Sequence, residues 1–575
     1  MNGLPEQSPR PLREPRPLRE PRWLREPRWL GWVGSPRSVV LLVLLATTLR
    51  LVWLAFFSSL TLTEDEAHYW LWAQHLDWSY YSKGPGVAWL IAASTALFGD
   101  TEFAVRLPAS LAAAVGALAA AESARSLSND RRAHTCAFVA AALYLVAPAL
   151  AVTGFLTTID APFLACWMLA VALTLRARTA PRLWALVGVT LAVGFLFKYT
   201  IALLVPGVLW LIWTHRHESG VKPRHLIALL LAAALGLLPV LLWNAQHDWA
   251  TLRHLLGHLG APGGDTGPSA PVPLATRALW PLEYLGFLLF IAGPVPMILL
   301  ITLLFRRFPL PERTLDTVRL ALPLAAFYLV VSLINRTEGN WAIAAPATLI
   351  PAASWAIVHG VRHNLWPIRF LWGATLFSGL ATWLIFFTLT TIATIPALHA
   401  IPARRVMGLR AHAAAVQAEL DRLHNQTGLP PFVITTHYGR ASQLAFYLPG
   451  HPTVYCTSAN TGGRKSQFNL WPRTDLDNPE TQRELVARPA LALGGDAQHW
   501  LPAFESLGPL GPLHAEPKAN RSAYLAYGYR GFDTWTPWQN RDGWTGPNSP
   551  PTETPPTDPP TGLLDPTTPV IPVAD

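Results

Sequence analysis

Three consecutive carboxylates, Glu64, Asp65 and Glu66, follow the first long apolar segment of the sequence. A charged side chain at membrane depth is costly, so its presence calls for a reason. A carboxylate held there can take the proton of a hydroxyl group that attacks a substrate. A structural alternative is a solvated helix start, because negative charge favours the amino-terminal end of a helix. His68 and Trp72 follow at helical spacing, which predicts a short helix in the membrane interface.

Basic residues recur in connections on the same side of the expected membrane spans. Lys83, Arg106, Lys198 and Arg336 are four of them, and Asp160 begins a later apolar segment. A single lysine could lie along the membrane and keep its charge in water, and Asp160 could simply cap a helix. Four cations beside carboxylates instead predict an anion site with a base nearby. A phosphate-bearing substrate fits, since Arg and Lys form charge-assisted hydrogen bonds with phosphate oxygens.

Membrane helices must position these residues. The chain has 575 residues, 51% of them hydrophobic and only 14% charged, which is too apolar for a soluble protein of this length. Apolar residues form blocks of about twenty, the length that spans a hydrocarbon core of about 30 Å. We therefore expect an all-α polytopic membrane module over residues 38–393. Its spans, about eleven, are expected at 38–60, 105–122, 135–151, 160–175, 183–197, 200–214, 225–243, 281–304, 318–334, 341–358 and 367–393.

The charges of the connections predict the orientation. Basic connections alternate with others, and the positive-inside rule assigns the basic ones to the cytoplasm. This explains the net charge of +9 without a nucleic-acid partner. The prediction is a multi-pass protein of the plasma (inner) membrane, with a cytoplasmic amino terminus and an extracytoplasmic carboxy-terminal domain. The basic connections are 1–37, 125–132, 176–182, 215–224, 306–313 and 362–369.

Two tails and one globular domain flank the membrane module. Residues 1–37 repeat a Pro-Arg-x-Leu-Arg-Glu motif, whose proline density favours an extended cytoplasmic tail. That tail could bind anionic lipid headgroups or merely orient the first span. Residues 394–536 have the composition of a small α/β domain, with strand-like runs at 431–436 and 490–493. Residues 537–575 are rich in Pro and Thr, which predicts disorder.

Other chemistries have less support. The sequence contains no Gly-rich nucleotide-phosphate loop, no Gly-x-Ser-x-Gly and no Cys-x-x-Cys. Its three cysteines do not make a disulfide framework. The pairs His68/His75 and His254/His258 have helical spacing, but no third ligand completes either pair. No metal site is therefore predicted, and a divalent cation is left open as a cofactor.

Several motifs closely resemble those of one family. Its signature is matched by Thr63-Glu-Asp-Glu-Ala-His-Tyr-Trp-Leu-Trp, by Leu76-Asp-Trp-Ser-Tyr-Tyr-Ser-Lys-Gly-Pro and by Leu97-Phe-Gly-Asp-Thr-Glu-Phe-Ala-Val-Arg-Leu-Pro. These motifs resemble the bacterial branch of the dolichyl-phosphate-mannose–protein mannosyltransferase superfamily, which includes aminoarabinose transferases and galacturonosyltransferases that modify lipid A. The resemblance covers about residues 38–475. It continues in Leu156-Thr-Thr-Ile-Asp, Gly194-Phe-Leu-Phe-Lys-Tyr-Thr, Trp243-Asn-Ala-Gln-His-Asp-Trp, Glu338-Gly-Asn-Trp, Ala445-Phe-Tyr-Leu-Pro-Gly and Ser466-Gln-Phe-Asn-Leu-Trp.

The resemblance implies a GT-C fold and a polyprenyl-phosphate sugar as donor. One departure is Ser82-Lys-Gly-Pro, where many relatives have two prolines; its lysine is more like the aminoarabinose-transferase pattern. The implied roles are Asp65 as general base, Glu66 as its support or an acceptor ligand, and Asp160 as the second family acid. Donor phosphate is expected at Arg106 and Lys198, with Lys83 and Asn244 as weaker assignments, and other substrate contacts at His68, Tyr69, Glu338 and Asn340.

The predicted function is an inverting membrane glycosyltransferase. It would move a sugar from the polyprenyl-phosphate donor to a hydroxyl of an extracytoplasmic acceptor: lipid A, another glycolipid, a cell-wall polymer or a protein. Membrane lipids, donor and acceptor are the expected partners. The alternative is a transporter or flippase of polyprenyl-linked sugars, although such proteins usually carry internal repeats, and none is convincing in these spans.

Overall fold

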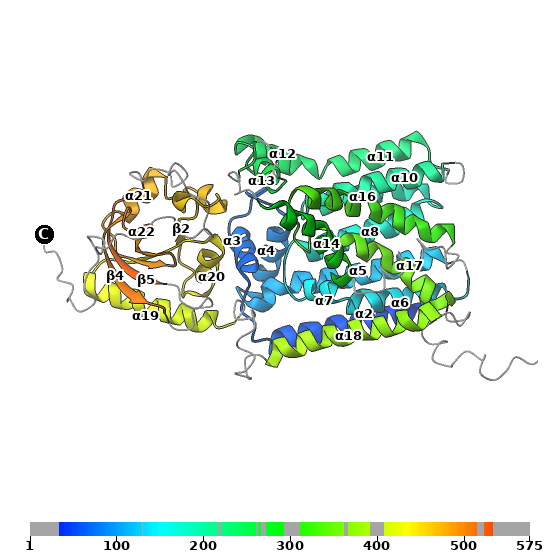
Figure 1. Ribbon diagram of the computed structural model, residues 1–575, viewed down its shortest axis with the longest axis horizontal. Helices are drawn as coiled ribbons and strands as arrows, with labels where there is room; N and C mark the ends of the chain where they lie inside the picture. Colours follow the sequence, from blue (N-terminus) through cyan, green and yellow to red (C-terminus); the bar gives the residue numbers. More distant parts are fainter. Residues whose placement is uncertain are drawn as a thin grey trace, which may run out of the picture.

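The computed structural model describes residues 34–128, 130–216, 220–259, 261, 263–265, 272–291, 311–360, 366–391, 407–513 and 522–532. A helical module and a carboxy-terminal domain lie end to end (Figure 1). The Pro-Arg repeat and the tail from residue 537, both predicted to be extended or disordered, lie outside the described residues.

Apolar helices form the module, and five of those described are long and apolar enough to cross a membrane: α2, α5, α8, α16 and the segment Pro223–Gln246. Further shorter apolar helices accompany them, so the expected count of about eleven spans stays a prediction. The helices of the module are α2 (Pro36–Phe56), α3 (Glu64–Ala73), α4 (Gly86–Phe98), α5 (Glu102–Leu127), α6 (Ala133–Val146), α7 (Pro148–Thr153), α8 (Asp160–Ala177), α9 (Trp184–Phe195), α10 (Leu204–Thr214), α11 (Pro223–Ala234), α12 (Leu237–Gln246), α13 (Ala250–His258), α14 (Leu274–Ile291), α16 (Glu312–Ile334), α17 (Ala344–Gly360) and α18 (Trp366–Thr391).

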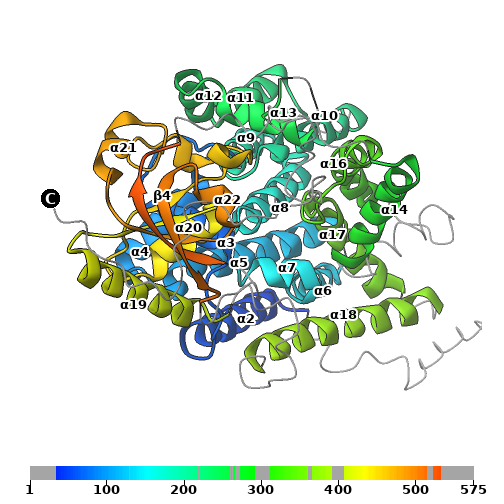
Figure 2. The same ribbon diagram turned by 60° about the vertical axis from the view of Figure 1, so that its left-hand side comes forward.

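Burial separates central from peripheral helices. In the most apolar stretch of α8, 78% of the residues are buried inside the protein, whereas the corresponding share for α2 is 22%. Helix α2 therefore presents most of its apolar side chains outward, as a lipid-facing helix does. Helix α5 packs against α6 and α8 through small residues such as Ala117 and Ala120, because alanine lets helix backbones approach closely. Figure 2 shows α5 and α8 in the interior of the module and α2 at its edge.

Proline and glycine interrupt two of the expected spans. The segment expected at 135–151 is divided into α6 and α7, and Pro148 begins the second helix. Proline has no N–H to continue the helical hydrogen bonds, so it suits a first helical position. The segment expected at 225–243 is likewise divided into α11 and α12 beside Gly236.

The carboxy-terminal domain is built on a five-stranded sheet with the order β2-β1-β3-β5-β4. Strand β1 pairs in parallel with β2 and β3, whereas β5 pairs antiparallel with β3 and β4. Helices α19 and α20 cover one face and α21 and α22 the other. The elements are α19 (Leu409–Thr427), β1 (Phe432–Thr435), α20 (Tyr438–Tyr447), β2 (Val454–Cys456), α21 (Pro479–Leu485), β3 (Ala490–Leu493), α22 (Ala497–Trp500), β4 (Phe504–Gly511) and β5 (Ala523–Tyr529).

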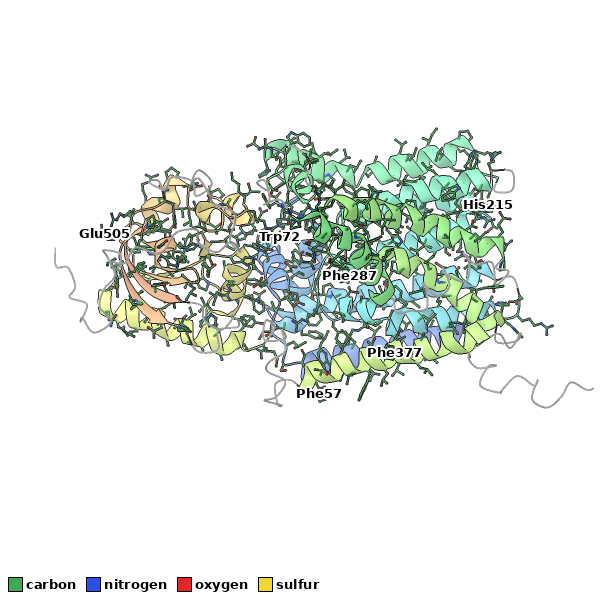
Figure 3. All side chains as sticks on the ribbon, viewed as in Figure 1. Phe57, Trp72, His215, Phe287, Phe377 and Glu505 are labelled. Carbon is green, nitrogen blue, oxygen red and sulfur yellow. The ribbon has the colours of Figure 1, made fainter. Side chains whose placement is uncertain are left out.

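The domain is seated on α3 through α20. One apolar cluster joins the two parts and includes the fully buried Trp72, which lies at the junction in Figure 3. At its edge, Gln443 Nε2 donates to the Leu62 carbonyl at 2.9 Å, and Leu62 N donates to the Tyr447 hydroxyl at 2.7 Å. A Cβ on Gly439 would lie 2.5 Å from Glu64 Cβ. Only glycine therefore lets the start of α20 approach the start of α3 this closely.

Candidate active site

A capping box begins α3 and sets the position of the acidic motif. Thr63 Oγ1 accepts from Glu66 N at 3.1 Å, and Glu66 Oε2 accepts from Thr63 N at 2.9 Å. This reciprocal pair satisfies two backbone donors that a helix start leaves open. The box also turns Glu66 toward the protein interior and leaves Asp65 on the exposed side of the first turn.

Glu66 and Arg106 form a buried ion pair. Arg106 Nε and Nη2 donate to the two carboxylate oxygens at 2.9 Å each, and the side chains are 0% and 1% exposed. Arg106 also donates to the carbonyls of Leu60 and Thr61 at 2.8 Å, and Thr157 N donates to Glu66 at 3.0 Å. Both side chains are thus enclosed by protein groups, and the predicted catalytic role of Glu66 and phosphate role of Arg106 stay predictions.

Asp65 has the opposite environment. Its side chain is exposed, and its carboxylate makes no hydrogen bond or salt bridge with any described residue. The surrounding protein nevertheless raises the pKa of the Asp65 carboxyl above its ordinary value by desolvation, while the nearby Lys83 ammonium acts against this shift. A more basic, accessible carboxylate without a partner suits a group that accepts a proton.

Lys83 is held beside Asp65 by a tightly packed loop. Gly86 N donates to the Leu196 carbonyl at 3.0 Å, and a Cβ on Gly84 would lie 2.4 Å from the same oxygen. The loop therefore lies against the segment that carries Lys198. Burial, followed by the charge of Lys198, lowers the pKa of Lys83 to about 8. Its ammonium has no hydrogen-bond or ion-pair partner within the described ranges.

Asp160, Lys198 and Asn340, expected from three separate motifs, come together. Lys198 Nζ donates to Asp160 Oδ1 at 2.7 Å and to the Asn340 carbonyl at 3.1 Å. Asn340 Nδ2 donates to Asp160 Oδ2 at 2.8 Å. The three side chains come from the start of α8, the loop after α9 and the loop before α17. Asp160 is close enough for its charge to affect the pKa values of Asp65 and Lys83, and the charge of Lys198 affects the pKa of Lys83.

Tyr69 also lies near this group. His68, in contrast, is enclosed by residues of the carboxy-terminal domain. Burial and then the charge of Asp65 raise the pKa of the Tyr69 hydroxyl. His68 is buried, and its Nδ1 lies 2.9 Å from the Ser442 hydroxyl. Its ring packs on Tyr438 and stacks on Phe468. Burial lowers the pKa of His68 to about 3, so its ring is neutral at the junction, and its predicted contact with substrate stays a prediction.

Three other expected residues are separate from this group. Asn244 is buried and bridges two helices, donating to the Val240 carbonyl at 2.8 Å and accepting from Thr251 N at 3.0 Å. Glu338 is exposed, and its backbone carbonyl accepts from Trp341 N at 3.0 Å. Arg336, one of the four basic residues predicted to form the anion site, pairs instead with Glu283.

The carboxy-terminal domain contributes a residue that the sequence did not predict, Arg464. Its Nη2 donates to the Tyr438 hydroxyl at 2.9 Å, and its guanidinium lies 5.1 Å from the centre of the Tyr438 ring. Its Nη1 lies 3.5 Å from Nε2 of His254, a residue of α13. Arg464 thus reaches from the domain to the module, close enough for its charge to oppose the rise that desolvation causes in the pKa of Asp65.

The histidines of α13 form a chain of polar contacts. His254 Nε2 and His258 Nε2 are 3.0 Å apart, and His254 Nδ1 lies 3.0 Å from Asp265, which also binds the Tyr81 hydroxyl. Burial lowers the pKa of His254 to about 4. Among the described residues, no group of three or more His, Cys, Asp or Glu side chains is arranged to hold a metal ion.

Comparison with known proteins agrees with the fold and the motifs. Residues 82–243 match the family model of dolichyl-phosphate-mannose-protein mannosyltransferases. The chain is 29% identical to lipid A galacturonosyltransferase RgtD of Rhizobium johnstonii, over 62% of this chain and 72% of that protein. It is 26% identical to an undecaprenyl phosphate-alpha-4-amino-4-deoxy-L-arabinose arabinosyl transferase of Pseudomonas paraeruginosa, over 68% of this chain and 78% of that relative.

The fold has a solved counterpart. ArnT of Cupriavidus metallidurans, crystallised with undecaprenyl phosphate, aligns with a TM-score of 0.54 and 15% identity, over 86% of this chain and 98% of ArnT. The fold is that of a membrane-embedded GT-C protein, and the matching family and relatives are glycosyltransferases. Within that class, the chain is similar to the dolichyl-phosphate-mannose-protein mannosyltransferase family over residues 82–243, and to an aminoarabinose transferase and a lipid A galacturonosyltransferase over most of its length.

Proposed function

We propose that this enzyme transfers a sugar from a polyprenyl-phosphate donor to an acceptor hydroxyl, with Asp65 as general base. The observation that carries the proposal is the accessible, unpaired Asp65 carboxylate beside the unpaired Lys83 ammonium, within reach of Lys198. A proton acceptor and phosphate-binding cations are the two groups that such a transfer requires. The fold neighbour bound to undecaprenyl phosphate supports this class of donor.

The reaction is a single displacement. The acceptor oxygen forms a bond to the anomeric carbon while the bond from that carbon to the phosphate oxygen breaks, which inverts the configuration. Asp65 takes the acceptor proton, and the polyprenyl phosphate leaves with both electrons of the broken bond. A positioned base typically contributes about 10²- to 10⁴-fold to the rate.

The two lysines have different tasks in this proposal. The leaving phosphate gains one negative charge, and Lys83 can meet it because no described carboxylate forms an ion pair with its ammonium, although the charges of Asp160 and Asp65 act on it. Lys198 is oriented by Asp160 and Asn340. A cation aimed at the place where charge develops stabilises the transition state more than the ground state. Asp160 is therefore a positioning residue for Lys198.

Glu66 and Arg106 hold the acidic helix in place. Their ion pair ties the start of α3 to α5 and to the backbone at Leu60 and Thr61. Because Asp65 precedes Glu66 directly, fixing Glu66 fixes the direction of the base. We assign this pair a positioning role instead of direct contact with the donor.

The acceptor and the orientation follow from the relatives and from the charge pattern. Because RgtD is named for lipid A, we propose a lipid A hydroxyl as the acceptor. The basic connections then lie in the cytoplasm, and the acidic motif and the carboxy-terminal domain lie on the opposite side of the inner membrane. No step of the proposed reaction requires a metal ion.

Transfer by the purified protein in liposomes tests the proposal. Undecaprenyl-phosphate galacturonate and lipid A are supplied, and products are analysed by mass spectrometry. Glycosylated lipid A and free undecaprenyl phosphate are expected. Movement of the donor between leaflets without a glycosylated product would instead indicate a flippase. The absence of both transfer and movement would refute both functions.

A second experiment tests the orientation. Lys465 is exposed in the carboxy-terminal domain, and Cys456 is buried. A Lys465→Cys variant in intact spheroplasts should react with a membrane-impermeant maleimide. Labelling only after the membrane is opened would reverse the proposed topology.

A further inference from the structure

Resting on the proposed function, we propose that Arg464 binds an anionic group of the substrates other than the donor phosphate. That group is a carboxylate on the transferred sugar or a phosphate on the acceptor. The carboxy-terminal domain would thereby determine which substrates the membrane module accepts.

Arg464 is held in a defined position at the junction. The Tyr438 hydroxyl accepts from Nη2 at 2.9 Å, and the guanidinium lies over the Tyr438 ring. Tyr438 begins α20 directly after His437, whose Nδ1 is 3.7 Å from a carboxylate oxygen of Glu64. The Arg464 guanidinium is thus anchored next to the acidic motif of α3, on the side formed by the domain.

No carboxylate of the described residues pairs directly with Arg464. The polar contacts of its side chain within the described residues are the Tyr438 hydroxyl and the His254 ring. The side chain is only partly exposed. A partly buried cation without a counter-charge is unfavourable unless an anion joins it. The guanidinium has five N–H donors in a planar fork that suits a carboxylate or a phosphate, and Tyr438 takes one of them.

The donor phosphate does not account for this cation. A sugar phosphodiester carries one negative charge. The unpaired ammonium of Lys83 can balance that charge, whereas Lys198 is already balanced by Asp160. Arg464 then supplies one further positive charge, from a different part of the fold. A guanidinium that approaches from the domain side, in addition to Lys83, suits a second anionic group of the bound substrates.

The test compares matched substrates. One donor pair is undecaprenyl-phosphate galacturonate and undecaprenyl-phosphate galactose, which differ by a carboxylate in place of a hydroxymethyl group. One acceptor pair is lipid A with and without its phosphates. The proteins are wild type, Arg464→Gln, Arg464→Lys and the control Lys465→Gln, which removes a neighbouring exposed cation.

A lost charge-assisted hydrogen bond lowers kcat/KM by about 10- to 100-fold. Arg464→Gln should show that loss for one charged member of a pair and less than about threefold for its uncharged partner. The pair that responds identifies the source of the anion. Arg464→Lys keeps the charge without the planar fork, so its preference for the charged substrate should lie between those of wild type and Arg464→Gln. It also keeps the inference testable if Arg464→Gln does not fold. Lys465→Gln should match wild type.

Two results would overturn the inference. Equal losses for all four substrate combinations would assign Arg464 to the donor phosphate or to folding, and no loss would leave it without a substrate role. If the wild-type protein transfers neither sugar, the proposed function itself fails. A wild-type protein that transfers while ignoring both charge differences refutes only the role of Arg464.

Discussion

Replacing Arg106 should damage stability far more than donor binding. The Arg106→Gln variant loses two charge-assisted bonds to Glu66 and two bonds to the carbonyls of Leu60 and Thr61. Removing one partner of a buried ion pair typically costs about 3–5 kcal/mol. Glu66 keeps backbone donors from Thr63 and Thr157. We therefore expect the free energy of unfolding to fall by an amount near the lower end of this range, about 3 kcal/mol.

Equilibrium unfolding in mixed micelles measures this loss. The matched control is Arg410→Gln, since Arg410 forms an exposed salt bridge with Glu102 at 2.6 Å, and such surface pairs contribute about 0–1 kcal/mol. A Glu66→Gln/Arg106→Gln double variant completes a mutant cycle. It should be less destabilised than the sum of the single variants, by about 1–3 kcal/mol.

Kinetics of the folded fraction decide between structure and phosphate binding. The donor KM of Arg106→Gln should stay within about threefold of wild type, because the buried guanidinium offers no surface to the donor. Normal stability together with a donor KM raised tenfold or more would refute the positioning role. That result would restore the phosphate assignment expected from the sequence.

Three further outcomes follow from the site. The transfer rate should fall at acid pH as Asp65 gains a proton, and again above about pH 8 as Lys83 loses one. The Lys83→Arg variant should lack the fall at alkaline pH, and a pH profile identical to that of wild type would contradict the role of Lys83. Asn340→Ala should lower kcat/KM about tenfold by releasing Asp160, and activity equal to wild type would remove Asn340 from the site. Gly439→Val should loosen the domain from α3 and speed its release by limited proteolysis, whereas an unchanged cleavage rate would show that the close approach is not needed.

The group of Asp160, Lys198 and Asn340 shows what the sequence could predict. Each residue stands in a motif at the same expected end of a span, and charge at membrane depth requires a partner. The sequence could therefore suggest that they meet, although not which atoms bond. The motif that begins at Thr63 likewise indicated a short helix, which is α3.

Arg106 shows a contact that the sequence could not reveal. The sequence presents it as an unpaired cation on the predicted outward side, which suggested a phosphate ligand. Its partner Glu66 lies 40 positions earlier, in the acidic motif that was itself assigned to catalysis. Composition and spacing cannot show that two charged residues satisfy each other. That requires the fold, which brings the start of α3 to the first turns of α5.

Arg464 and helix α4 were beyond the sequence signals. Arg464 lies in a Gly-Gly-Arg-Lys turn that resembles an ordinary solvated loop, and it contacts His254 from 210 positions away. Helix α4 has 13 residues, too few for the length expected of a span, so its apolar residues appeared to belong to a loop. Strand β4 contains Gly and Pro, which are rare within strands.

The most direct test of the account separates binding from chemistry in Asp65→Asn. Donor affinity is measured by titration with undecaprenyl phosphate, and transfer by a single-turnover assay with preloaded donor. The account predicts affinity close to wild type and a transfer rate reduced by about 10²- to 10⁴-fold. Single-turnover transfer at the wild-type rate would show that Asp65 is not the base, and the proposed mechanism would fail.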